Sequence, residues 1–394
     1  MKTKTKTYWR IGWRVALPFA LILVCGLAAA TDHTTNGANG GAAARPRERT
    51  GGITYFHDED TAVPWSIHVV KVDRSHPDLR FETTLGSGRQ IGMSLVSDQV
   101  KTLAAQHGRP LAAVNGDFYK SNEDYPGDPE GVQIFHGELV SAPRPSHSCF
   151  WVDAGGFPRI TNVQSRFNLT LPNGKSSSFG LNEEREKDAV VLFTTANGAS
   201  TRARGGVELI LTRGKSDEWL PLRVGVLYQA RVKQVNPEGD SPLTPETMVL
   251  SAGPEVSGKF AGLKPGDEVK ISTGTLPDMS GSQVAIGGGP ALVRGGVALS
   301  FTGLQPRHPR TALGWNREHY FMVEVDGRQR VSAGMSFPEL AAYMAKLGCT
   351  DAINLDGGGS ATLWAFGNVM NNPSEGHERP AANGLVLVRK PAQD

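Results

Sequence analysis

The chain has 394 residues, of which 39% are hydrophobic and 20% are charged, with 47 Gly and 25 Pro. Glycine and proline together stay below the roughly 25–30% that is typical of low-complexity chains, and the length is sufficient for a large core. The composition therefore excludes a disordered, collagen-like or coiled-coil protein for the bulk of the chain. The formal net charge of +2 is only a weak indication of an anionic partner.

The first 30 residues have the pattern of a secretory signal peptide. Basic residues within positions 2–14 precede an apolar run at 15–27, and three alanines follow at 28–30. The alternative is a transmembrane anchor, but the run is shorter than the ~20 residues that a spanning helix needs, and Pro18 interrupts it. We expect cleavage after residue 30, export to the periplasm or the extracellular space, and no stable membrane span afterwards.

Removal of the signal peptide changes the charge of the protein. The segment carries five basic residues and no acidic ones, so the formal charge of the remaining chain is −3 rather than +2. This value excludes the basic footprint of a nucleic-acid-binding protein. Cys149 and Cys349 remain, and they could either pair as a disulfide in an oxidising compartment or stay as buried thiols.

Residues 31–50 are rich in Gly, Ala, Thr, Asn and Arg without an apolar period, which predicts a flexible linker before a single domain at 51–394. Within this domain, the apolar patterns predict a strand at 66–72, a helix at 94–107 that ends at Gly108, and a strand at 111–114. Between residues 131 and 281, short apolar segments alternate with Gly and Pro turns, which is typical of antiparallel sheet. These segments include 207–211, 224–228 and 269–271.

The C-terminal third alternates strand and helix signals. The pattern predicts a strand at 320–325, a helix at 336–347 with a capping box formed by Ser336 and Glu339, and strands at 352–355 and 361–364. We therefore expect an α+β fold, with largely antiparallel or mixed sheets and a few packed helices in a single catalytic domain.

Two helix–strand units end in the same Asn-x-Asp pattern, Asn115 with Asp117 and Asn354 with Asp356. Residues two apart on a strand point to the same face, so each unit would place an amide and a carboxylate side by side. The alternative is a coincidence of two Asx-turn caps. Three glycines follow Asp356 and three occupy 287–289, which predicts either tight turns or close approach of a ligand to the backbone.

Further candidates lie in two loops. Arg310 could bind a carboxylate or phosphate, or it could be an ordinary exposed arginine; His308 is a weaker acid–base candidate. Asp326 and Arg328 follow a predicted strand.

The chain lacks HExxH, GxSxG, CxxC and EF-hand patterns, which argues against zincins, α/β-hydrolases and calcium sensors. Carboxylates, amides, glycines and an arginine suit cleavage of a glycoside or a phosphodiester.

Five motifs then occur in order: NGDFY at 115–119, IGGGPALV at 286–293, HPRTALG at 308–314, VDGRQ at 325–329 and NLDGGGSATLW at 354–364. Together they resemble the phosphodiester glycosidase family, and Gly131 and residues 378–380 also fit. The resemblance covers about residues 65–388. It implies hydrolysis of a glycosidic bond, in the characterised case the bond from a sugar anomeric carbon to a phosphodiester.

Carried onto this sequence, the resemblance implies catalytic roles for Asp117, Asp356, Arg310 and Asp326. It implies substrate-binding roles for Asn115, Thr311, Arg328, Asn354, Gly357, Gly358, Ser360 and His308. We hypothesise that Arg310 binds the phosphate, that Asp356 is the nucleophile or base, and that Asp117 is its partner carboxylate.

We therefore expect a secreted hydrolase that acts on a sugar-1-phosphodiester or a related glycosidic bond in an envelope glycan or exopolysaccharide. Its expected partner is a carbohydrate or sugar phosphate. One alternative is a non-catalytic glycan-binding or exopolysaccharide-assembly protein on the same fold. Another is a metal-dependent hydrolase in which Asp117, Asp326 and Asp356 bind Ca²⁺ or Mg²⁺, because oxygen-only ligands suit these ions.

Overall fold

The computed structural model describes residues 46–121, 124–215 and 217–391. The expected signal peptide and residues 31–45 of the expected linker lie outside the described residues. The protein is mostly β-sheet, with 44% strand and 9% helix, so the α+β expectation is corrected to a β-rich fold. In the described part, only α1 (Val96–Thr102) and α2 (Phe337–Lys346) are α-helices, and neither is long and apolar enough to cross a membrane.

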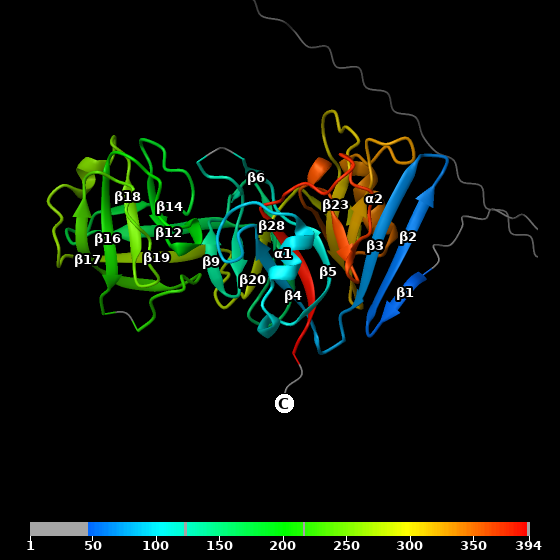
Figure 1. Cartoon of the computed structure of the whole chain (residues 1–394), viewed down its shortest axis with the longest axis horizontal. Helices are drawn as coiled ribbons and strands as arrows, with labels where there is room; N and C mark the ends of the chain where they lie inside the picture. The colour runs from blue at the N-terminus through cyan, green and yellow to red at the C-terminus, as the bar shows by residue number, and fades with distance from the viewer. Residues whose placement is uncertain (1–45, 122–123, 216, 392–394) are drawn as a thin grey trace, which may run out of the picture. The chain divides into compact units, whose positions relative to one another are not determined.

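The first sheet has eight antiparallel strands and contains much of the N- and C-terminal sequence (Figure 1). In spatial order they are β1 (Pro46–Thr50), β2 (Ile53–Asp60), β3 (Trp65–Asp73), β24 (His319–Val325), β23 (Arg310–Trp315), β25 (Asp351–Asn354), β21 (Ala291–Arg294) and β22 (Val297–Ala298). The linker expected at residues 31–50 is wrong at its end, because residues 46–50 form strand β1. The two-residue turn at Gly51 and Gly52, both with positive φ, pairs it with β2 as a hairpin.

The second sheet has five antiparallel strands. In spatial order they are β27 (Asn368–Val369), β26 (Leu363–Ala365), β5 (Arg109–Asn115), β28 (Asn383–Arg389) and β4 (Leu79–Leu85). α1 packs on this sheet through Val96 and Val100. The predicted helix at 94–107 is too long, because Leu103 adopts an extended backbone and a separate 3₁₀ turn follows at Ala105–His107.

These two sheets pack face to face between the two helices. Leu313 and Met322 of the first sheet share a core with Leu385 of the second. On the opposite face of the first sheet, α2 buries Leu340 and Met344, and its capping box at Ser336 is present as predicted. The layers therefore follow the order α2, first sheet, second sheet, α1, and the period-2 alternation of each strand divides its side chains between two cores.

The middle of the chain forms the other sheets. A five-stranded sheet contains β11 (Pro158–Asn162), β10 (Ser148–Val152), β20 (Val284–Gly287), β8 (Gln133–Phe135) and β9 (Glu138–Ser141). An eight-stranded sheet contains β13 (Ser176–Ser178), β12 (Gln164–Thr170), β19 (Glu268–Leu276), β17 (Leu227–Asn236), β16 (Val207–Arg213), β18 (Met248–Ala252), β15 (Val190–Phe193) and β14 (Gly180–Leu181). β6 (Tyr119–Lys120) and β7 (Asp128–Pro129) form a two-stranded hairpin.

The antiparallel expectation for this region is confirmed except for one parallel pair, β14 with β15. The strand predicted at 224–228 begins only at Leu227, because Gly225 forms a turn with φ of +79°. Cys149 in β10 and Cys349 after α2 are both free and buried in separate core clusters. The two cysteines are thus thiols rather than a disulfide.

The packing of α2 on the first sheet depends on Gly314 in β23. A Cβ at this position would lie 2.7 Å from Met344 Cε and 2.8 Å from Cys349 Sγ. Gly314→Ala should therefore lower the free energy of unfolding by about 1–3 kcal/mol, measured by urea denaturation. Gly274→Ala in β19 is the matched control, because its nearest neighbour would be 3.7 Å away. Equal stability of the two variants would contradict the close packing of α2.

Candidate active site

The two Asn-x-Asp units are bonded to each other where their strands end. The Asp356 N–H donates to Gly116 O at 2.8 Å, and Asn115 Nδ2 donates to Asp356 O at 2.7 Å. Asn115 Oδ1 accepts from Thr311 Oγ1 at 2.7 Å and from the Thr362 N–H at 3.0 Å. The side chain of Asn115 thus joins the first and second sheets.

The second amide has a similar anchoring role. Asn354 is buried, and its Nδ2 donates to Gly289 O at 2.8 Å and to Leu355 O at 2.6 Å. It therefore ties the second triple-glycine segment to the end of β25. Asn115 and Thr311 are bonded to each other, and Asn354 anchors a neighbouring loop, while the substrate-binding roles predicted for the three residues stay predictions.

Asp117 is a buried carboxyl group enclosed by glycines. Its Oδ1 accepts from the Phe118 N–H at 2.8 Å and its Oδ2 from the Gly131 N–H at 2.6 Å. A Cβ at Gly287 would lie 2.1 Å from Oδ2, and a Cβ at Gly131 would lie 2.9 Å from the same atom. Both glycines are therefore needed because the side chain of Asp117 occupies the space that a Cβ would fill.

Three carboxyl groups interact electrostatically at this point. Burial raises the pKa of Asp117 to about 8, against the opposing effect of the two backbone N–H donors, and the charges of Glu130 and Asp356 raise it further. Burial also raises the pKa of Asp356, while hydrogen bonds from Ser360 and the Gly357 N–H lower it. The site can thus hold a proton on a carboxyl group near neutral pH.

Glu130 was not predicted from the sequence. Its N–H donates to Phe118 O at 2.9 Å, because the β6–β7 hairpin folds this segment back onto the NGDFY motif. Its Oε2 lies 2.9 Å from Arg144 Nη1 and 3.9 Å from His147 Nδ1. No local pattern marks Glu130, and only the hairpin pairing could have indicated that it returns to Asp117.

The glycines after Asp356 form a tight turn that packs against the start of β23. Residues 358–360 make one 3₁₀ turn, and the Gly358 N–H donates to Pro309 O at 3.0 Å. A Cβ at Gly357 would lie only 2.6 Å from the same carbonyl oxygen. Ser360 Oγ accepts from Arg379 Nη2 at 2.7 Å and donates to Asp356. Arg379, within the matching segment 378–380, is therefore a site residue that the prediction missed.

The predicted arginines lie on the other flank of this turn. Arg310 is 8% exposed, which excludes an ordinary exposed loop arginine. Its Nε donates to Met335 O at 2.8 Å and its Nη2 to Pro306 O at 3.0 Å. Burial, followed by the charge of Arg328, lowers the pKa of Arg310 to about 10.

Arg328 is exposed and lies over the glycine turn. A Cβ at Gly358 would lie 3.0 Å from its Nη2, which is 3.4 Å from His308 Nδ1. Within the described residues, neither Arg310 nor Arg328 forms an ion pair with an acidic side chain. The flank therefore carries positive charge that no carboxylate neutralises.

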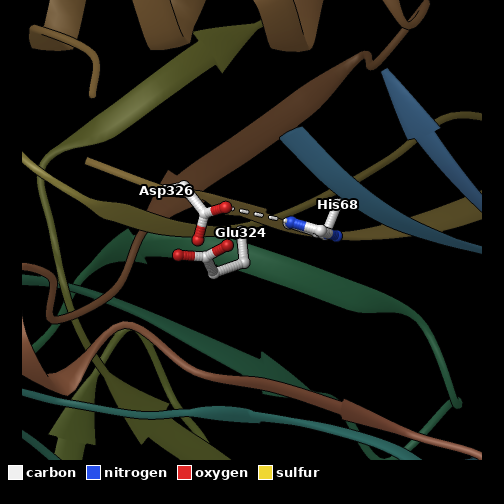
Figure 2. A group of neighbouring side chains, drawn as sticks. All are labelled: His68, Glu324 and Asp326. Carbon is white, nitrogen blue, oxygen red and sulfur yellow. Dashed lines mark hydrogen bonds and ion pairs between the residues drawn. The ribbon is translucent and has the colours of Figure 1, made fainter. Parts of the chain in front are cut away.

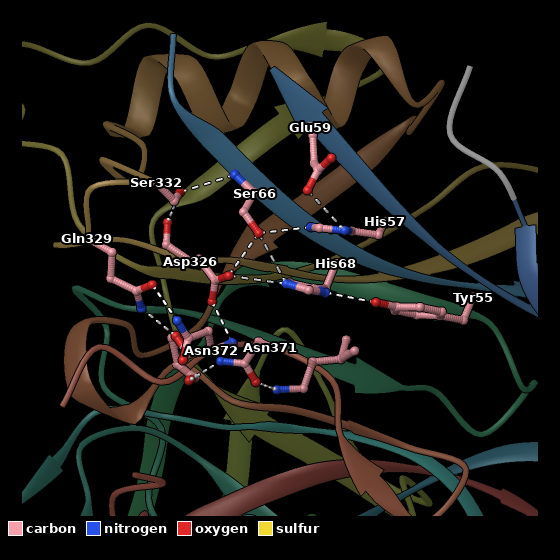
Figure 3. A network of polar contacts seen from close by, with 12 residues as sticks. Tyr55, His57, Glu59, Ser66, His68, Asp326, Gln329, Ser332, Asn371 and Asn372 are labelled. Carbon is pink, nitrogen blue, oxygen red and sulfur yellow. Dashed lines mark hydrogen bonds and ion pairs between the residues drawn. The ribbon is translucent and has the colours of Figure 1, made fainter. Parts of the chain in front are cut away.

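Asp326 belongs to a different group of side chains. Its Oδ2 is 3.2 Å from His68 Nε2 (Figure 2) and accepts from Ser66 Oγ at 2.8 Å (Figure 3), while its Oδ1 accepts from the Asn372 N–H at 2.8 Å. Asp326 lines a cavity of about 630 Å³ whose walls do not include Asp117 or Asp356. The proposed ligand trio of Asp117, Asp326 and Asp356 is therefore not assembled around one point.

The titration of Asp117 can be tested through stability. Its pKa is raised from 3.8 to about 8 in the folded chain, so the native state holds an extra proton between these values. The resulting stabilisation is complete below pH 3.8 and is lost as the pH rises towards 8. The unfolding free energy of wild type minus that of Asp117→Asn should therefore fall across this window, by at most about 1.4 kcal/mol per pH unit.

The measurement is urea denaturation of both proteins at a series of pH values. A difference in unfolding free energy that is the same at every pH reports the different hydrogen bonding of Asn. The change of this difference with pH reports the proton bound to Asp117. A difference that does not change with pH would show that the Gly131 and Phe118 N–H groups keep Asp117 ionised.

Comparison with known proteins shows a similarity that is confined to the C-terminal part of the chain for the family model. Residues 226–388 match the family model described as phosphodiester glycosidase. A segment of 67 residues is 40% identical to N-acetylglucosamine-1-phosphodiester alpha-N-acetylglucosaminidase of Bos taurus, covering 17% of this chain and 12% of that protein. The matches to curated relatives span only 12–13% of the length of those proteins.

Two solved structures share the fold. A Synechocystis protein superposes with a TM-score of 0.69 at 18% identity, covering 86% of this chain and 63% of the other. A Burkholderia pseudomallei protein superposes with a TM-score of 0.63 at 23% identity, covering 82% and 74%. The family match thus includes the Arg310, Asp326 and Asp356 motifs, and it confirms that the chain resembles the phosphodiester glycosidase family over residues 226–388.

Proposed function

We propose that this protein is an exported hydrolase that cleaves the glycosidic bond between a sugar and a phosphodiester group. The observation that supports this most directly is the arrangement around the turn at residues 356–360. Asp356 at the start of the turn interacts electrostatically with Asp117 and Glu130, while Arg310 and Arg328, which form no ion pair within the described residues, lie against Gly357 and Gly358. A sugar-1-phosphodiester needs carboxyl groups at the anomeric carbon and cations at the phosphate, so it matches both groups of charges.

In this proposal, Asp356 acts as the nucleophile or base, and Asp117 acts as the protonated partner. Asp356 is only partly buried and is held by Ser360 and Gly357, which positions it as nucleophile or base at the anomeric carbon. Asp117, whose pKa is raised to about 8, is protonated at neutral pH and is the partner carboxyl group. Glu130 adds a third, accessible carboxylate whose charge adds to the effect of burial in raising the pKa of Asp117.

The arginines fit the phosphate side of the substrate. A phosphodiester leaves as a stable anion, so the reaction needs less protonation of the leaving group and more stabilisation of negative charge. Arg328 over Gly358 can contact this anion directly, and Arg310 is fixed behind it by two backbone carbonyls. Together with the signal-peptide pattern, this favours an anionic envelope glycan or exopolysaccharide as the substrate.

The role of Asp356 is tested by Asp356→Asn. The variant keeps the shape of the side chain but removes its charge, so turnover of a sugar-1-phosphodiester should fall by at least about 1,000-fold while the melting temperature stays close to wild type. Asp351→Asn, at the opposite end of β25, is the matched control and should retain activity. Wild-type turnover by a folded Asp356→Asn would remove Asp356 from the mechanism.

The role of Arg328 is tested by comparing two substrates. Arg328→Gln should lower kcat/KM about 10- to 100-fold for a sugar-1-phosphodiester but much less for a neutral nitrophenyl glycoside, because only the first presents a phosphate. Arg330→Gln, two residues further on and also exposed, is the control. An equal loss on both substrates would contradict a phosphate contact. Binding of glycans without turnover of any substrate would instead support the non-catalytic alternative.

A further inference from the structure

A second group of ionisable side chains lies outside the carboxylate–arginine site. His68 on β3 is directly opposite Glu324 on β24 in the antiparallel pairing, and Asp326 follows two residues later. All three therefore point to the same side of the first sheet. Their potential ligand atoms lie within 4.8 Å of one another, and Figure 2 shows the three side chains converging.

Glu324 is the unusual member of this group. It is 1% exposed, and in the part of the chain that the structure describes neither carboxylate oxygen has a partner with full hydrogen-bond geometry. The side-chain amide of Asn371 donates to Ala361 O at 3.1 Å and also interacts with Glu324, whose pKa it lowers against the larger effect of burial. A buried carboxylate with few donors is costly, and burial raises the pKa of Glu324, so this side chain is either protonated or paired with a compensating cation. Figure 2 shows its oxygens directed beside those of Asp326.

The surrounding residues hold the other two side chains in the orientation of ligands. His68 Nδ1 is 2.9 Å from the Tyr55 hydroxyl group, which leaves Nε2 directed towards Asp326. Asp326 accepts from Ser66 and from the Asn372 N–H (Figure 3). Such outer hydrogen bonds are typical of metal ligands, since they fix the tautomer and the direction of the lone pairs.

The group can also be reached from solvent. His68 and Asp326 line the cavity of about 630 Å³ whose walls also include Trp65, Asn371 and Asn372. This cavity provides both an entry path for an ion and space for a further ligand.

We propose that His68, Glu324 and Asp326 bind a divalent first-row transition-metal ion, Zn²⁺ or Mn²⁺, with an open coordination position that faces this cavity. One imidazole and two carboxylates are a ligand set that suits these ions, whereas Ca²⁺ and Mg²⁺ prefer oxygen-only sets. The ion neutralises Glu324 and fixes Asp326, which begins the turn that carries Arg328. This proposal does not depend on the hydrolase function.

The test is metal binding by the full chain after treatment with chelator. Titration calorimetry with ZnCl₂ and MnCl₂, together with elemental analysis, should give one ion per chain. Glu324→Gln and His68→Gln should each weaken binding at least about 10-fold. Glu59→Gln on the rim of the same cavity and Asp356→Asn at the other site are the controls and should bind as wild type does.

Stability provides a second measurement. In chelator, Glu324→Gln should melt no lower than wild type, because Gln is a neutral isostere of this buried carboxyl group. At the same Zn²⁺ concentration, the rise in melting temperature should be larger for wild type than for the variant. For the wild-type chain loaded with Mn²⁺, pulsed electron paramagnetic resonance should show the nitrogen coupling of one histidine, which requires no variant to fold.

Three results would overturn the proposal. The first is the absence of binding to folded wild type at millimolar Zn²⁺ and Mn²⁺. The second is a bound Mn²⁺ ion without histidine nitrogen coupling. The third is binding that Asp356→Asn removes and Glu324→Gln leaves unchanged, which would place the ion at the glycine turn instead.

Discussion

The rest of the site depends on the hydrogen bonds by which Asn115 joins the end of β5 to the segment around Asp356. Asn115, at the end of β5, donates to the backbone of Asp356 and accepts from Thr311 and Thr362, so a single buried amide joins the two facing sheets. Loss of this amide would leave the buried Thr311 hydroxyl group and Thr362 N–H without these partners, which makes the connection costly to remove. Asp117 and Asp356, which each follow one of the bonded loop ends, are thereby attached to a fixed junction between the sheets.

Close backbone approach determines where the charges of the site lie. Gly287 and Gly131 leave space for the carboxyl group of Asp117, and the absence of a Cβ at Gly357 lets the turn pack on Pro309. Arg310 and Arg328 lie against this turn, and Asp356 at its start interacts electrostatically with Asp117 and Glu130. Burial disfavours the charged form of both an acid and a base. It therefore raises the pKa of Asp117 and lowers the pKa of Arg310.

The strand β24 connects this site to the group formed by His68, Glu324 and Asp326. Asp326 faces the cavity beside β3, whereas Arg328, two residues later and with φ of 60°, faces the glycine turn. One short turn thus contributes to two separate clusters. A change in the position of Asp326 would be transmitted directly to the arginine that we assign to the phosphate.

The sequence alone determined the main strands, the capped helix α2 and the motifs that resemble phosphodiester glycosidases, because these depend on local periodicity and on residues close in the chain. It overestimated the helix at 94–107 and missed β1, since Leu103 and the Gly51–Gly52 hairpin were weak local signals. Only the tertiary structure decided that Asp326 is separated from Asp117 and Asp356. It also added Glu130 and Arg379 to the site, and it placed His68 beside Glu324 and Asp326, which the strand period already puts on one face. These residues are positioned by strand pairing and by the β6–β7 hairpin, which bring together segments that are separated in the chain. No local sequence pattern indicates such contacts.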